Sequence, residues 1–223
     1  MTQSLVWRLA MKDLHVHRGL MLAAAIGGIV SLLAASVNRV GFSIGSICFI
    51  TTVIAYGVVL AMFSVAQERK DKSVMFVLSL PIAPRDYVRA KLLGTLITFL
   101  IPWALLTAGA FVLIAASPGI KDGLMPTALL MQVYFLCAFC VVMAVALIAS
   151  SEVVMTFSII ITNMSFTLFM VGIGQIPSFA NAGERATANW SPAFFAVLAG
   201  ELALIAIALS VPSFYYSRRR DFI

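Results

Sequence analysis

The chain has 223 residues, of which 62% are hydrophobic and 11% are charged, and its mean hydropathy is +1.05. Soluble globular domains carry about 25% charged residues, so this composition excludes a soluble protein. The net charge of +6 would suit a nucleic-acid partner, but the basic residues follow a membrane topology, so we expect no nucleic-acid binding.

Residues 2–18 form the first predicted element, an amphipathic helix. Arg8, Lys12 and His15 recur at helical spacing on one face, while Trp7 and Met11 lie on an apolar face. A helix of this kind lies in the membrane interface, ahead of the first span. A plain cytoplasmic extension of that span is the alternative interpretation.

Six apolar runs follow, and each is long enough to cross a hydrocarbon core about 30 Å thick as a helix. They cover residues 20–37, 42–66, 92–116, 126–149, 153–174 and 193–215. A backbone in lipid must satisfy its own hydrogen bonds, so continuous apolar runs predict helices rather than strands. The predicted fold is an all-α integral membrane protein, with residues 1–223 forming one transmembrane domain. A GxxxG spacing at Gly41–Gly45 opens the second run, but this pattern is common in apolar segments.

The basic residues predict the orientation of these spans. Only Arg39, Lys121 and Arg185 fall on one side of the membrane. The other side has both termini and twelve of the 15 basic residues: Arg8, Lys12, Arg18, Arg69, Lys70, Lys72, Arg85, Arg89, Lys91, Arg218, Arg219 and Arg220. The positive-inside rule therefore predicts a multi-pass protein of the cytoplasmic membrane, with both termini and residues 67–91 in the cytoplasm.

The sequence contains no visible motif for catalysis or for a cofactor. No GxxxxGK[ST] occurs, and no paired carboxylates or His/Asp/Ser set stand at catalytic spacing. Cys48, Cys137 and Cys140 lie inside apolar runs, where thiols pack as small apolar groups. His15 and His17 point to different faces of a helix. We therefore expect no catalytic residue, metal site or cofactor on this chain.

The segment 67–91, between the second and third runs, holds nine of the chain's 24 charged residues. Ser73 can cap a short helix inside it, and Pro81 ends that helix. The helix carries an apolar run that includes Met75, Phe76, Leu78 and Leu80. Two turns are too short to span a membrane, so this helix rests on the membrane surface or docks into the groove of a partner protein.

This segment resembles the one that follows the second helix in ABC-2 type permeases, the membrane subunits of ATP-driven exporters. The resemblance is carried by Glu68, Leu78-Ser79-Leu80-Pro81, Arg85, Tyr87, Val88 and Lys91. The amphipathic N-terminal helix, the six spans and the longer loop between the last two spans are similar as well. One departure is Ala83-Pro84, where many relatives carry a hydroxyl residue before the arginine.

The resemblance implies a coupling helix that inserts into a separate ATPase subunit, which would bind ATP and Mg²⁺. The residues it implies for ATPase coupling are Glu68, Met75, Phe76, Leu78, Leu80 and Arg85. Six spans are half of the usual set, which implies a dimer with a second permease copy or a paralogue. Membrane lipid is the remaining expected partner.

The resemblance also places the second and fifth spans along a central cavity of the dimer. Asn163 and Thr167 share one face of the fifth run, and Thr52 and Tyr56 lie one turn apart in the second. These four residues are the candidates for the substrate pathway, and contact between helices is the alternative role for them. Because all four are neutral, they favour amphipathic or apolar cargo.

Two other functions fit parts of the sequence. A haem- or cofactor-handling permease would use His15, His17 or the cysteines, whose placement argues against it. A membrane scaffold or sensor without transport activity would have no need for an apolar helix bracketed by charge. Glu201, about 8 residues into the last run, lies near the interface if the polar loop 175–192 forms a re-entrant helix; that loop can equally be a simple connection.

Overall fold

The computed structural model describes residues 11–67, 84–117, 119–149 and 151–218. Its six long helices are α2 (Arg18–Val37), α3 (Arg39–Ala61), α6 (Pro84–Ala116), α7 (Met125–Ile148), α8 (Glu152–Gln175) and α9 (Pro192–Arg218). Each is long and apolar enough to cross a membrane, and residues 11–16 form a short helix ahead of α2. The described part of the chain contains no strand. The predicted all-α fold with six spans and a preceding helix is confirmed.

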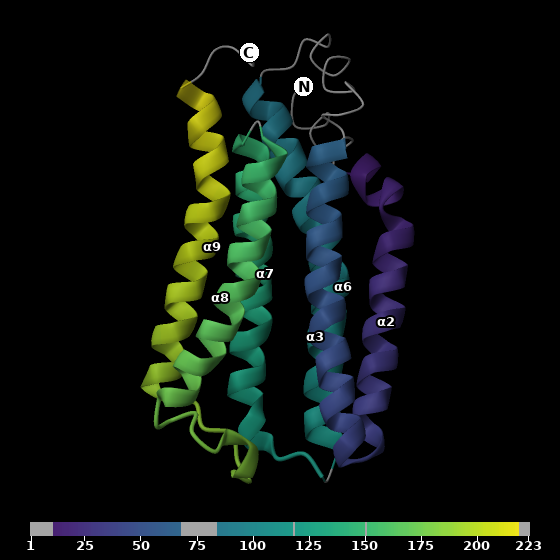
Figure 1. Cartoon of the computed structure of the whole chain (residues 1–223), viewed down its shortest axis with the longest axis vertical. Helices are drawn as coiled ribbons and strands as arrows, with labels where there is room; N and C mark the ends of the chain where they lie inside the picture. Colours follow the sequence, from purple (N-terminus) through teal and green to yellow (C-terminus); the bar gives the residue numbers. More distant parts are fainter. Residues whose placement is uncertain (1–10, 68–83, 118, 150, 219–223) are drawn as a thin grey trace.

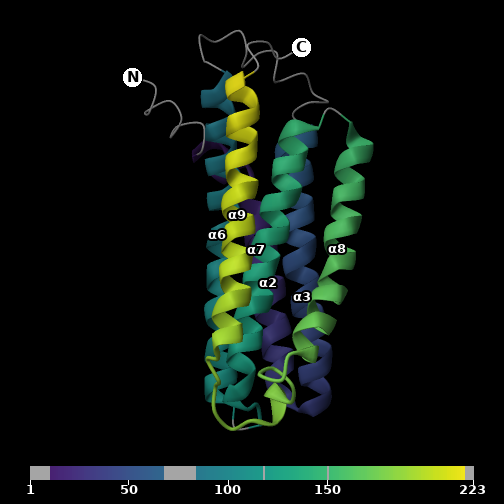
Figure 2. The same ribbon diagram turned by 90° about the vertical axis from the view of Figure 1, so that its left-hand side faces the viewer.

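The six helices run side by side along the long axis of the molecule (Figures 1 and 2). The start of α2, the end of α9 and the described ends of α3 and α6 lie together at one end, which we call the proximal end. The connections from α2 to α3, α6 to α7 and α8 to α9 lie at the opposite, distal end. The described residues on either side of 68–83 therefore lie at the proximal end, together with the start of α2 and the end of α9.

Helices α2 and α3 form a tightly packed hairpin at the distal end. The Asn38 side chain caps α3 by accepting a hydrogen bond from the Gly41 amide at 2.7 Å. A Cβ atom on Gly45 would lie only 2.5 Å from the Ser31 carbonyl oxygen and the Ala35 nitrogen. The GxxxG spacing is thus the contact face of this hairpin, where small residues let two backbones approach closely.

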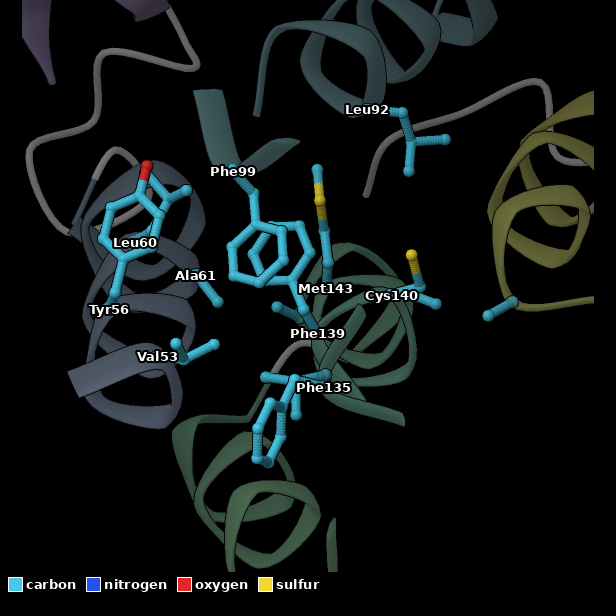
Figure 3. Close-up of a cluster of buried hydrophobic side chains, with 14 of the residues drawn as sticks. Val53, Tyr56, Leu60, Ala61, Leu92, Phe99, Phe135, Phe139, Cys140 and Met143 are labelled. Carbon is cyan, nitrogen blue, oxygen red and sulfur yellow. The ribbon is translucent and has the colours of Figure 1, made fainter. Parts of the chain in front are cut away.

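Helix α7 lies at the centre of the bundle and is the most buried of the six spans, while α8 is the least buried. On its proximal half the Phe139 ring stacks on Phe99 of α6, with ring centroids 4.0 Å apart (Figure 3). Phe99 in turn stacks against Tyr56 of α3 at 5.5 Å. Stacked pairs of this kind stabilise a core by about 0.5–1.5 kcal/mol beyond their buried area. The aromatic column therefore joins α3, α6 and α7.

The longer loop between α8 and α9 contains turns and one short 3-10 helix, η3 (Ala182–Glu184), and no re-entrant helix. It packs on a second 3-10 helix, η2 (Asp122–Leu124), where the Gly123 amide donates to the Arg185 carbonyl oxygen at 3.2 Å. The Arg185 guanidinium donates to the Ser178 carbonyl oxygen at 2.8 Å. The first of these hydrogen bonds holds the loop against η2 at the distal end, and the second joins two residues of the loop itself.

Candidate functional site

The predicted coupling segment is only partly within the described residues. Arg85 lies in the first turn of α6. The other five predicted coupling residues lie outside the described residues: Glu68, Met75, Phe76, Leu78 and Leu80. Their contact with an ATPase remains a prediction. The helices on either side of the segment lie within the described residues.

The helix that leads into the segment changes its geometry. Helix α3 is α-helical to Ala61, and the chain then continues as a π-helix, η1 (Met62–Gln67). Short π-helical stretches are rare and occur frequently at functional sites, because the wider turn shifts the register of the residues that follow. The π-helix η1 is the last described element before the predicted coupling segment.

The N-terminal residues are bonded to both helices that flank the segment. The Nζ of Lys91 in α6 lies 3.0 Å from Oδ2 of Asp13, and these side chains are 5% and 11% exposed. On the other flank, the fully buried hydroxyl of Ser64 in η1 lies 3.3 Å from Nε2 of His17. A buried charge needs a partner, so the ion pair holds the N-terminal helix against α6. No sequence pattern predicts the pairing of Asp13 with Lys91.

One of the predicted substrate-pathway residues, Asn163, lines a small cleft between α3, α6, α7 and α8. The cleft has a volume of about 30 Å³, and Asn163 and Thr162 of α8 supply its polar side. Gly57 of α3 and Phe139 of α7 belong to its apolar walls. A space of this volume holds about one or two water molecules. We call it the Asn163 cleft.

Of the four predicted pathway residues, Asn163 alone lines this cleft in the described structure. Thr52 is half-buried against Gly27 of α2, and its hydroxyl donates to the Cys48 carbonyl oxygen at 2.8 Å. Tyr56 is buried, and its hydroxyl donates to the Thr98 carbonyl oxygen of α6 at 2.6 Å. Thr167 is exposed on α8.

The two polar faces of α8 have different surroundings. On one face the Tyr134 hydroxyl of α7 lies 2.6 Å from Ser165 Oγ and donates to the Thr162 carbonyl oxygen at 2.9 Å. This face is a contact between helices. The Asn163 amide nitrogen donates to the Ile159 carbonyl oxygen at 2.8 Å. Among the described residues its Oδ1 makes no hydrogen bond, so this residue of the cleft lining retains a free acceptor.

The protein-family comparison decides the class of this chain. A model described as ABC-2 family transporter protein matches residues 9–218, which is nearly the whole chain. The chain belongs to the ABC-2 transporter family. It is therefore a multi-pass membrane protein and the permease of an ABC transporter, a transport component that is not itself catalytic. Membership of this family implies association with an ABC ATPase. No curated protein and no solved structure matches the chain.

The ABC-2 permease also buries two polar side chains, one that the sequence analysis assigned to the interface and one that it did not single out. Glu201 lies nine residues into α9 and is 5% exposed, and Gln132 of α7 is 1% exposed. Neither carboxyl oxygen of Glu201 and neither amide atom of Gln132 has a hydrogen-bond partner among the described residues. The interpretation of Glu201 as interfacial depended on a re-entrant helix, and residues 176–191 form turns instead. Burying an unpaired polar group inside a membrane-spanning helix costs free energy, so Glu201 and Gln132 are both candidates for a functional role.

Proposed function

We propose that this ABC-2 permease is the translocation subunit of an ATP-driven exporter. Two copies, or one copy and a paralogue, enclose the pathway, and a separate ATPase subunit supplies the energy. ATP and Mg²⁺ bind on that subunit and not on this chain. Membership of the ABC-2 family carries this proposal, and the absence of a P-loop motif from the sequence supports it.

The ATPase docks on the segment 67–91 at the proximal end. The sequence of this segment supports the docking, because charge keeps the segment at the membrane surface while its apolar run supplies a contact to bury. The helices on both sides of the segment are held to the N-terminal residues, α6 by the contact of Lys91 with Asp13 and η1 by that of Ser64 with His17. These contacts support docking at this place. The proximal end faces the cytoplasm, as the distribution of basic residues indicates.

The pathway runs along the exposed side of α8. The Asn163 cleft is too small in one chain to hold a substrate, which supports completion of the pathway by a second copy. Helix α8 is the least covered span and exposes Thr156 and Thr167, polar groups that a purely lipid-facing helix would rarely carry. The mixture of neutral polar and aromatic groups suits an amphipathic or apolar cargo.

Copurification tests the proposal directly. A tagged permease is purified in mild detergent from the cells that produce it, and associated chains are identified by mass spectrometry. We expect a P-loop ATPase in amounts comparable to the permease, and ATP hydrolysis when the complex is placed in vesicles. A permease that purifies without any ATPase, or only with chains that lack nucleotide-binding motifs, would contradict the proposed function.

A further inference from the structure

A second cavity, separate from the Asn163 cleft, lies in the distal half of the bundle. Its volume is about 210 Å³, and α2, α3, α6 and α7 supply most of its walls. Phe42 and Ile50 of α3, Leu113 of α6 and Met131 of α7 are among the apolar side chains that line it. No residue lines both this cavity and the Asn163 cleft. We call it the distal cavity.

The shape of the distal cavity suits a hydrocarbon chain. From Phe42 to Ile50 the cavity follows eight residues of α3, a length of about 12 Å at 1.5 Å per residue. An engineered apolar cavity of about 150 Å³ stays dry and binds benzene, so a larger apolar space is a poor site for water and a good one for hydrocarbon. The walls belong to spanning helices, so the medium around this partly open cavity is the hydrocarbon of one membrane leaflet.

Two cationic side chains precede lining residues of the distal cavity by three positions each. Arg39 is exposed at the first position of α3, about one turn before Phe42. No described residue forms an ion pair with its guanidinium. Lys121 is exposed three residues before Leu124, which lines the cavity, and its ammonium donates to the Glu184 carbonyl oxygen at 3.0 Å. An ammonium has three donors, so two remain for another acceptor.

One wall residue of the distal cavity carries a hydroxyl that is unpartnered within the described part of the chain. Thr127 of α7 lines the distal cavity, and its hydroxyl has no hydrogen-bond partner among the described residues. Asp122 and Glu184 are the acidic residues at the same end; both are exposed. The distal end of the bundle thus combines exposed cations, a hydroxyl on the cavity wall and an apolar cavity. A phospholipid offers a matching phosphate, ester carbonyl and acyl chain.

We propose that the distal cavity binds one acyl chain of a phospholipid from the leaflet at the distal end, with the lipid phosphate bound at Arg39. Guanidinium groups bind phosphate oxygens through charge-assisted hydrogen bonds, often two at once. Lys121 adds a second cation, and the Thr127 hydroxyl donates to an ester carbonyl. This inference depends on the membrane-spanning fold and not on the direction of transport or the identity of the cargo.

Photo-crosslinking tests the acyl-chain site. The intact permease complex is placed in vesicles that contain phosphatidylglycerol with a diazirine in its acyl chain, and labelled peptides are mapped by mass spectrometry. We expect labelling concentrated on residues 42–50 and 124–131. Ala110→Phe, which fills the cavity, should reduce this labelling at least several-fold. Ala108→Phe is the matched control, because Ala108 is exposed two residues away on the same helix and does not line the cavity.

The headgroup is tested with a second probe. Arg39→Gln should reduce labelling by the phosphatidylglycerol probe several-fold while leaving labelling by a diazirine diacylglycerol, which has no phosphate, unchanged. Size-exclusion chromatography checks each variant for folding, and Ala128→Leu replaces Ala110→Phe if the latter aggregates. Labelling that is spread evenly over the exposed faces of α2 and α8, or that neither cavity-filling variant reduces, would overturn the proposal. Equal loss of both probes in Arg39→Gln would overturn the assignment of the phosphate.

Discussion

The Nζ of Lys91 lies 3.0 Å from Oδ2 of Asp13, and both side chains are almost fully covered. The two residues are 78 positions apart in the chain, so their ion pair closes a long-range contact at the proximal end. It fixes the N-terminal helix to the helix that follows the predicted coupling segment. Motion of that segment should therefore be transmitted to the N-terminal helix as well as to α6.

Removing one partner of this ion pair should destabilise the permease. Asp13→Asn removes the carboxylate that lies 3.0 Å from the buried Lys91 ammonium, and breaking a buried ion pair in this way typically costs about 3–5 kcal/mol. Thermal unfolding of the detergent-purified permease measures the effect. Arg89→Met is the control, because Arg89 is exposed on the same helix and should change stability little. If Asp13→Asn and Arg89→Met unfold at the same temperature, the pair has no structural role.

Two glycines that differ in the space around them test how tightly the α2–α3 hairpin is packed. Gly45→Ala should destabilise the α2–α3 hairpin by about 1–3 kcal/mol, since the new methyl group would lie 2.5 Å from backbone atoms of α2. Gly174→Ala in α8 has nothing within 4 Å and should be neutral or stabilise by up to about 1 kcal/mol. The same thermal unfolding assay compares the two. Equal melting temperatures would show that the hairpin yields to the extra methyl group at no cost.

The sequence predicted the spans well because each span must satisfy its backbone hydrogen bonds by itself. An apolar run of sufficient length is therefore enough to predict a helix, whatever its neighbours are. The faces of the helices were harder to predict. A spanning helix is apolar toward lipid as well as toward its neighbours, so periodicity does not reveal which side is buried. Tyr56 packs against α6 and Thr52 against α2. Both contacts depend on how the helices assemble and not on residue spacing within one helix.

The same limitation explains the missed polar residues. Glu201 was assigned by its distance from the start of an apolar run, and that distance does not tell whether it faces α7 or lipid. Lys91 was assigned to the cytoplasmic side and Asp13 falls within the predicted N-terminal helix, but no spacing rule links positions 78 residues apart. Pairings between distant segments come from tertiary packing, which a single sequence does not display.

Labelling of single cysteines tests the orientation. After replacement of Cys48, Cys137 and Cys140, Lys70→Cys should react with an impermeant maleimide only from the cytoplasmic side of vesicles. Thr187→Cys, which is exposed in the distal loop, should react only from the opposite side. Thr187 is preferable to Arg185 because Arg185 bonds the loop together. Reaction of position 70 from outside would contradict the predicted topology.

The α8 face should matter for transport more than for assembly. Asn163→Leu removes the amide from the Asn163 cleft, and Thr167→Val removes an exposed hydroxyl from the same helix. We expect both variants to alter the transport rate or the cargo preference in vesicles while complex yield stays normal. Ser165→Ala is the control for the contact face, since its hydroxyl bonds Tyr134 of α7. Normal transport with a loss of dimer in Asn163→Leu and Thr167→Val would favour a packing role.

The coupling segment gives the sharpest prediction for the proposed function. Burying an apolar side chain such as Leu78 stabilises a contact by about 1.5–3 kcal/mol, whereas an unpaired buried carboxylate opposes it strongly. Leu78→Asp should therefore abolish transport and reduce copurification of the ATPase. Membrane insertion should be unaffected, because residue 78 lies outside the six spans. Leu78→Met is the matched control and should retain both activities, since it conserves volume and polarity.

Glu68→Ala distinguishes docking from coupling in the same assay. A surface ion pair contributes only about 0–1 kcal/mol, so this change should leave ATPase association nearly intact. If Glu68 takes part in coupling, the variant complex should hydrolyse ATP at close to the normal rate but transport less cargo for each ATP hydrolysed. Copurification, ATP hydrolysis and transport are measured together on all three variants in vesicles. Wild-type values for Leu78→Asp in all three measurements would mean that this helix lies on the lipid surface and contacts no ATPase.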